Sequence, residues 1–207
     1  LLIQLMSIAG FARQDVGAVM ISSVVPQTVF PLRKMSQSFF NCRAFVVGED
    51  VPIPIENKLL NPKEAGADRL VNALAAVRRY TPPLMVVDFG TATTFDIVDD
   101  TGAFIGGIIA PGINLSIEAL HRAAAKLPRI AVEPPPQVIG RSTVQAMQSG
   151  IFFGYVGLIE GLAQRVQAEY GKSMTVIATG GLAPLFARHC PVVQHVDPDL
   201  TMIGLVE

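Results

Sequence analysis

The sequence is poor in charged residues and in cysteine, and both shortages narrow what the chain can be. Charged residues make up 16% of its 207 residues, and the net charge is −1. Nothing electrostatic therefore favours binding to nucleic acid or to an anionic membrane, so any phosphate site must be local, built from backbone amides and bound cations. The two cysteines, Cys42 and Cys190, lie far apart in the sequence. Free buried thiols in a reducing compartment are predicted, rather than a disulfide framework or a metal site.

Long apolar runs and metal-ligand spacings are also scarce. Residues 142–159 carry no charge, but three Gly, two Gln and two Ser interrupt them, so no transmembrane span is predicted. His121, His189 and His195 have no acid, Cys or His at metal-binding spacing, and structural roles are expected for them. The chain shows no signal peptide and begins without a methionine, which we interpret as a truncated start of a soluble cytoplasmic protein.

The chain nevertheless has enough apolar residues for a substantial core. Half of its residues are hydrophobic, which suits one large domain or two small ones. Strands are expected at 19–25 and 44–47, with a helix at 29–40 between them, and this alternation predicts an α/β architecture. Thr81-Pro82-Pro83 interrupts the chain before the next strand. We place a domain boundary there, giving domains of residues 1–82 and 83–207.

The most informative stretch follows this boundary. An apolar run at 84–87, typical of a buried strand, leads into Asp88-Phe89-Gly90-Thr91-Ala92-Thr93-Thr94. Further strands are expected at 95–98 and 104–109. Gly90 would let backbone approach a ligand, beside hydroxyls and a carboxylate, which suits a polyphosphate with its counter-ions. The same residues also fit an ordinary hairpin whose threonines favour β structure.

Two shorter segments carry similar signals. Gly66-Ala67-Asp68-Arg69 opens a helix predicted to run to Arg79. Asp68 in its first turn suits the helix dipole, and this structural role stays open beside a functional one. Thr179-Gly180-Gly181 follows a strand predicted at 174–178. Glycine pairs are common, so this signal is weak when taken alone.

A long helix is predicted to start at Ser142 or Thr143, either of which can cap it. One face carries an apolar stripe and another a stripe of small residues. Each glycine costs about 1 kcal/mol relative to alanine in a helix, so a close-packed neighbour must offset the cost. A second subunit and the chain's own sheet are both open as that neighbour. The apolar stripe is Val144, Met147, Ile151, Tyr155, Leu158, Leu162 and Val166, and the small one is Ala146, Gly150, Gly154, Gly157 and Gly161.

These segments, in this order, resemble the motifs of type III pantothenate kinases, members of the acetate kinase, sugar kinase, Hsp70 and actin superfamily. Residues 88–94 resemble the family's second phosphate motif, 66–69 its substrate motif and 179–181 its adenosine-binding turn. The resemblance implies two RNase H-like, actin-like domains. The first would be incomplete, because the family's initial Asp-x-Gly-Asn-Thr phosphate motif has no counterpart here.

The resemblance also implies an activity: ATP-dependent phosphorylation of pantothenate to 4′-phosphopantothenate, the first step of coenzyme A biosynthesis. ATP, Mg²⁺ and K⁺ (or NH₄⁺) would be the cofactors, and the protein would form a homodimer. Asp68 would be the general base and Asp88 would hold the monovalent cation. Pantothenate would contact Gly66, Ala67, Asp68, Arg69 and Thr143, with Thr143 reaching across the dimer as one option; ATP would contact Gly90, Thr91, Gly180 and Gly181.

Two other functions stay open at this point. One is a non-catalytic regulator of transcription, because members of the same family have been described as Bvg accessory factors. A nearly neutral chain without a helix-turn-helix pattern makes direct DNA binding a poor fit. The other is a different small-molecule kinase of the superfamily, against which residues 66–69 argue, because that segment carries acceptor specificity in the family.

Overall fold

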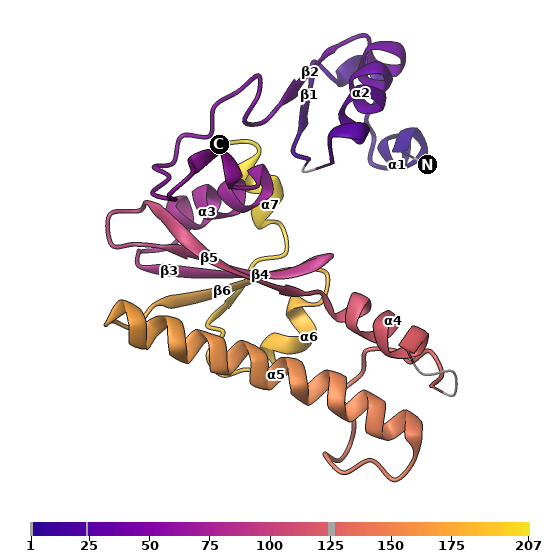
Figure 1. Ribbon diagram of the computed structural model, residues 1–207. Helices are drawn as coiled ribbons and strands as arrows, with labels where there is room; N and C mark the ends of the chain where they lie inside the picture. The colour runs from indigo at the N-terminus through magenta and orange to yellow at the C-terminus, as the bar shows by residue number, and fades with distance from the viewer. Residues whose placement is uncertain (1, 24, 124–126) are drawn as a thin grey trace.

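The computed structural model describes residues 2–23, 25–123 and 127–207, and it has the α/β architecture that the sequence predicts. Its main feature is a five-stranded sheet with strand order β5-β4-β3-β6-β7 (Figure 1). Neighbours within β3, β4 and β5 are antiparallel, whereas β3, β6 and β7 run parallel. The strands are β3 (Leu84–Phe89), β4 (Ala92–Val98), β5 (Phe104–Pro111), β6 (Thr175–Gly180) and β7 (His195–Val196).

Helices cover both faces of this sheet. Figure 1 shows α5 (Thr143–Tyr170) and α6 (Ala183–Ala187) on one face, and α3 (Ala67–Arg79) and α7 (Leu200–Gly204) on the other. The larger core, on the α5 face, contains Phe95, Phe152 and Phe186. The smaller core, on the α3 face, contains Leu84, Val86 and Leu200. Successive side chains of a strand point to opposite faces, so each strand supplies both cores.

A smaller unit precedes the sheet and lies to one side of it in Figure 1. Its strands β1 (Ala18–Ile21) and β2 (Arg43–Val46) are parallel and pack with α2 (Pro26–Met35), and α1 (Leu2–Ile8) lies nearby. The predicted strand at 19–25 is shorter in the structure. It ends at Ile21 because Pro26 begins a helix, a position that suits the fixed φ of proline. Short turns lie at Arg13–Asp15, Ser36–Phe40 and Pro62–Glu64.

The helix α3 precedes the predicted domain boundary but packs on the five-stranded sheet. Its buried residues Ala73, Ala75 and Ala76 lie in one core with Leu84 and Val86 of β3. Small side chains let the helix approach the sheet closely, and Gly204 of α7 has no room for a Cβ beside the Val71 carbonyl oxygen. The division of the chain at residues 82 and 83 stays a prediction. The position of α3 is determined by its packing on the larger sheet.

The long helix α5 begins where the sequence predicts. The side chain of Ser142 accepts a hydrogen bond from the Gln145 N–H, and Gly171 ends the helix with a φ of 81°. Met147, Ile151 and Tyr155 of the predicted apolar stripe are buried, but further along the helix the buried residues are Ile159 and Ala163. Leu158 and Leu162 are only half-buried. The buried positions continue in steps of four, and each such step advances slightly more than one turn of 3.6 residues, so the buried face rotates along the helix away from the predicted stripe.

The small-residue stripe of α5 does not pack against the chain's own sheet. Among the residues that the structure describes, a Cβ at Gly150, Gly154 or Gly157 would meet nothing within 4 Å beyond the helix's own backbone. Of the two neighbours considered for this stripe, close packing on the sheet is therefore wrong for these three positions.

Candidate active site

The first turn of α3 places Asp68 beside a hollow. Gly66 caps this helix in an extended conformation, and the Asp68 carboxylate accepts the Arg69 backbone N–H at 2.9 Å. The position suits an acid, because unpaired N–H groups and the positive end of the dipole face it. The neighbours Ala65 and Ala67 line a hollow of about 570 Å³ whose other wall is the smaller unit, including Val47 and Gly48. Asp68 is half-buried.

Asp88 lies at the end of β3 on the same face of the sheet. Asn72, one helical turn after Asp68, donates its side-chain N–H to Asp88 at 3.0 Å, and Thr201 of α7 donates to the Asn72 oxygen at 2.6 Å. Burial raises the pKa of Asp88, the Asn72 hydrogen bond opposes this, and the charge of Asp68 adds to the increase. The structure therefore brings Asp68 and Asp88 into one electrostatic neighbourhood, linked through α3.

A third acid, Asp96 of β4, joins this neighbourhood, and our sequence reasoning did not single it out. Its side chain is fully buried and accepts the Arg69 Nε–H at 2.5 Å and the Thr94 hydroxyl at 3.1 Å. Burial raises the pKa of Asp96 to about 6, against the lowering effect of the Arg69 charge and these hydrogen bonds. The available signal was an acid inside an apolar strand, which needs a buried partner.

The glycines predicted to contact nucleotide surround Asp88. Gly180 has a φ of +89°, and a Cβ there would lie 2.8 Å from the Asp88 carboxylate. Gly90 and Thr91 form the exposed turn after β3, and Gly112 packs against the Thr91 carbonyl oxygen so closely that it has no room for a side chain. Gly181 faces open space. Four of the predicted residues, Gly90, Thr91, Asp88 and Gly180, therefore lie at one edge of the sheet.

Thr143 is the predicted site residue that lies apart from this group. It is exposed at the start of α5, which Figure 1 shows beyond the sheet on the face opposite α3. Among the described residues, no hydrogen bond or ion pair joins Thr143 to Asp68, Arg69 or Asp88. A role for Thr143 at this site would need a second copy of the chain.

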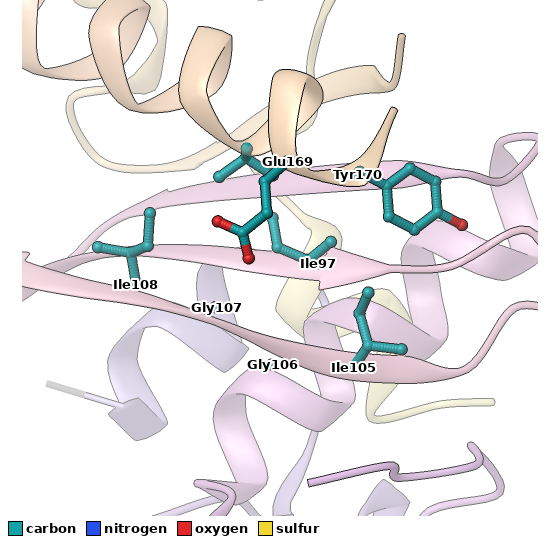
Figure 2. Close-up of a pocket in the computed structure, with 8 residues that line it drawn as sticks. Ile97, Ile105, Gly106, Gly107, Ile108, Glu169 and Tyr170 are labelled. Atoms are coloured by element: carbon teal, nitrogen blue, oxygen red, sulfur yellow. The ribbon is translucent and has the colours of Figure 1, made fainter. Parts of the chain in front are cut away.

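A second hollow lies on the α5 face and has a different character. Figure 2 shows Ile97, Ile105 and Ile108 on the strands, with Glu169 and Tyr170 of α5 above them. Its volume is about 270 Å³, and its lining is mainly aliphatic. The acids on the α3 face are separated from it by the sheet.

Few protein groups at this edge of the sheet are suited to bind cations. Within residues 2–23, 25–123 and 127–207, no cluster of three or more His, Cys, Asp and Glu side chains is arranged to hold a metal ion. The hydroxyl of Thr179 is buried without a partner. Thr179 is also the residue paired with Asp88 in the register of β3 and β6. Oxygen atoms of this kind suit a hard cation, so Asp88 and Thr179 are the residues at this edge that could contribute to an open cation site.

Comparison with solved structures identifies the fold. The chain shares its α/β fold with a conserved Baf family protein from Campylobacter jejuni, with a TM-score of 0.63 over 98% of this chain and 85% of the other at 19% identity. In the described part of the chain, every helix is too short or too polar to cross a membrane.

Sequence comparison then identifies the family. A sequence model of the type III pantothenate kinase family matches residues 1–165. Type III pantothenate kinases of Paramagnetospirillum magneticum and Rhodospirillum rubrum are 58% and 56% identical to this chain, over 100% and 99% of it and 80% of each relative. That of Caulobacter vibrioides is 56% identical over 99% of this chain and 79% of the relative. The chain belongs to the type III pantothenate kinase family.

Proposed function

We propose that the protein transfers the γ-phosphoryl group of ATP to the primary hydroxyl of pantothenate, forming 4′-phosphopantothenate in the first step of coenzyme A biosynthesis. One observation supports the proposal: in a member of this family, Asp68 lies close enough to Asp88 for its charge to raise the pKa of Asp88, and Arg69, next to Asp68, pairs with the buried Asp96. Phosphoryl transfer needs mainly positioning and charge neutralisation, so a site of few, well-held polar groups is sufficient.

Asp68 is the general base in this proposal. A carboxylate beside the acceptor can take up the hydroxyl proton as the bond to phosphorus forms. Arg69, with Gly66, Ala67 and Thr143, holds pantothenate. The hollow beside Ala65 and Ala67 supplies room for an elongated acceptor next to Asp68.

Asp88 and the glycine turns serve the nucleotide side. The exposed turn of Gly90 and Thr91 offers the Thr91 N–H and hydroxyl to ATP phosphates, while the Gly90 N–H bonds to the Ala92 carbonyl oxygen and shapes the turn. Gly180 and Gly181 leave room for the nucleoside. Asp88, with the unpartnered hydroxyl of Thr179, would hold K⁺ or NH₄⁺. When bound, this ion and Mg²⁺ neutralise phosphate charge.

The same proposal extends to the architecture of the whole protein. The two units correspond to two RNase H-like, actin-like domains divided near residues 82 and 83, and the first domain is incomplete in this chain. Family membership and the separate small core around Ile21, Ala44 and Val46 support a distinct first unit, although α3 packs on the larger sheet. Two free, buried cysteines are consistent with the reducing conditions of a cytoplasmic location.

A homodimer is part of the proposal as well. Gly150, Gly154 and Gly157 line a face of α5 that no other described residue fills. A helix from a second copy could approach this face closely, and the dimer would supply Thr143 from the partner. Light scattering that gives the mass of a monomer would contradict this part.

A coupled assay tests the activity. Full-length protein is incubated with pantothenate, ATP, Mg²⁺ and K⁺, ADP release is followed, and the product mass is determined. We expect ADP formation that depends on pantothenate and falls when Na⁺ replaces K⁺. Turnover of another small alcohol or acid in place of pantothenate would favour a different kinase of the superfamily. No acceptor-dependent ADP release at all would favour a non-catalytic role.

A further inference from the structure

The buried acid Asp96 has no part in the activity proposed above, yet it holds a residue that does. It is 0% exposed, so it cannot touch a substrate. One carboxylate oxygen accepts the Arg69 Nε–H at 2.5 Å, and the other accepts the Thr94 hydroxyl at 3.1 Å. With both oxygens engaged, the carboxylate has a fixed orientation, and so does the Nε edge of the guanidinium.

Two further contacts restrict Arg69. Its guanidinium carbon lies 5.4 Å from the centre of the Phe104 ring. A Cβ at residue 107 would lie 2.6 Å from Nη2, so glycine is needed there for the side chain to pass. The guanidinium is thus held by an acid at one edge, by an aromatic ring and by backbone, which leaves it little rotational freedom.

One donor of Arg69 is nevertheless unused. Nη2 is buried, and among the described residues it has no hydrogen-bond partner. A buried donor without a partner is costly, and a planar guanidinium suits a carboxylate. The Arg69 side chain as a whole is 15% exposed, so a guanidinium fixed at Nε remains partly open to solvent, as a preorganised anion-binding group requires.

We infer that Asp96 is a positioning residue for the acceptor, acting through Arg69 to orient an N–H group toward the carboxylate of pantothenate. This inference rests on the proposed function. It differs from a purely structural ion pair in one measurable respect: Asp96 should matter for acceptors that carry a carboxylate and much less for acceptors that lack one.

The test compares two acceptors on the full-length protein: pantothenate, and its alcohol analogue in which a hydroxymethyl group replaces the carboxylate. For Asp96→Asn we expect kcat/KM to fall about 10- to 100-fold for pantothenate, mainly through KM, because slight misplacement of a binding group has effects of this size. For the alcohol, and for KM of ATP, we expect changes below about threefold. Arg69→Gln should show the same selectivity, and the double variant should be no worse than the single ones, because the two residues act as a unit.

A matched control comes from the turn after the same strand. Asp100 pairs with Lys172 and is exposed, away from Arg69, so Asp100→Asn should leave both acceptors unchanged. Equal losses for both acceptors in Asp96→Asn, or no loss for either, would overturn the inference. Failure of the wild-type protein to phosphorylate either acceptor would instead reject the proposed function.

A milder variant covers the case in which Asp96→Asn does not fold. Thr94→Val removes the hydroxyl that donates to Asp96 and changes no charge. We expect a selective loss of about two- to fivefold for pantothenate, in the same direction as the stronger variant. An equal effect on both acceptors, or none, would again overturn the inference.

Discussion

The two faces of the five-stranded sheet differ most at the ends of the strands. On the α5 face, Val87 and Phe89 of β3 and Phe95 of β4 belong to the larger apolar core. On the α3 face, the residues that alternate with them include Asp88 and Asp96. Because strand side chains alternate, one set of backbone hydrogen bonds supports both a core and a polar site. Acids can be buried on one face because the other face and α3 supply the apolar packing and the hydrogen-bond partners.

The two faces of the sheet contribute to different properties of the protein, one to stability and the other to activity. Burial of large aromatic side chains on the α5 face stabilises the fold, whereas buried acids on the α3 face contribute little net stability and are retained where they do something else. Substitutions should therefore separate cleanly: changes on one face should act on turnover, and changes on the other on the free energy of unfolding.

The largest expected effect is on the α3 face. Asp68→Asn should lower kcat by about 10² to 10⁴-fold, the usual range for losing a general base, while the melting temperature stays within a few degrees of the wild type. Steady-state assays with pantothenate, together with thermal unfolding, measure both quantities. Turnover within threefold of the wild type would remove Asp68 from the mechanism.

The matching change on the α5 face should act on stability instead. Phe152 is 1% exposed and stacks on Phe186 with ring centres 5.1 Å apart. Phe152→Ala should lower the free energy of unfolding by about 3 to 5 kcal/mol, and kcat measured at low temperature, where the variant is folded, should change less than threefold. Urea unfolding and assays at the same temperature provide the check. A loss of turnover as large as that of Asp68→Asn would contradict the claim that the α3 face determines turnover and the α5 face determines stability.

A pH dependence of stability should single out Asp96. Its pKa is raised from the ordinary value of 3.8 to about 6, so the folded state binds this proton more tightly than the unfolded state. The contribution to stability is fully present below about pH 4 and is lost as the pH rises to about 6, a change of roughly 3 kcal/mol. Asp88, whose pKa is also raised, acts in the same direction, whereas acids with lowered pKa values, including Asp99 and Asp100, act in the opposite direction.

The difference in the free energy of unfolding between the wild type and Asp96→Asn isolates the pH-dependent contribution of Asp96. The stability of the wild type relative to the variant should decrease as the pH rises from 4 to 6 and then stay level. Chemical unfolding at several pH values measures this difference. If it is flat across that range, Asp96 is not the source of the dependence.

Sequence patterns predicted the main strands and the long helix, and they also predicted most of the polar residues at the end of β3. Apolar alternation and turn residues predicted β3, β4, β5 and α5, because local patterning determines these elements. The motifs placed Asp68 and Asp88, but neither motif contains their partners. Asn72 and Thr201 meet only because α3 and α7 pack together, 129 positions apart in the chain.

Long-range pairing also explains the two points that the sequence left open or missed. Asp96 lies in an apolar strand and gains its role from Arg69, 27 residues earlier, which no local pattern shows. The glycines of α5 are compatible with close packing on either the sheet or another subunit, and only the position of the helix excludes the sheet. Periodicity shows which residues share a face of a helix, but not what that face contacts.

The smallest expected effects come from two matched Thr→Val substitutions, one on each face of the sheet. Thr93 and Thr179 each bury a hydroxyl that has no partner among the described residues. Valine has nearly the same shape, so either substitution should raise the free energy of unfolding by about 1 kcal/mol, by removing an unsatisfied polar group. Thr93 alternates with residues of the α5 face, and Thr93→Val should leave activity unchanged. Thr179 pairs with Asp88 on the α3 face, so Thr179→Val should raise the K⁺ concentration for half-maximal activity at least about fivefold. Thermal unfolding and K⁺ titrations of both variants measure these two effects. If the two variants depend on K⁺ in the same way, the Thr179 hydroxyl does not contribute to the cation site.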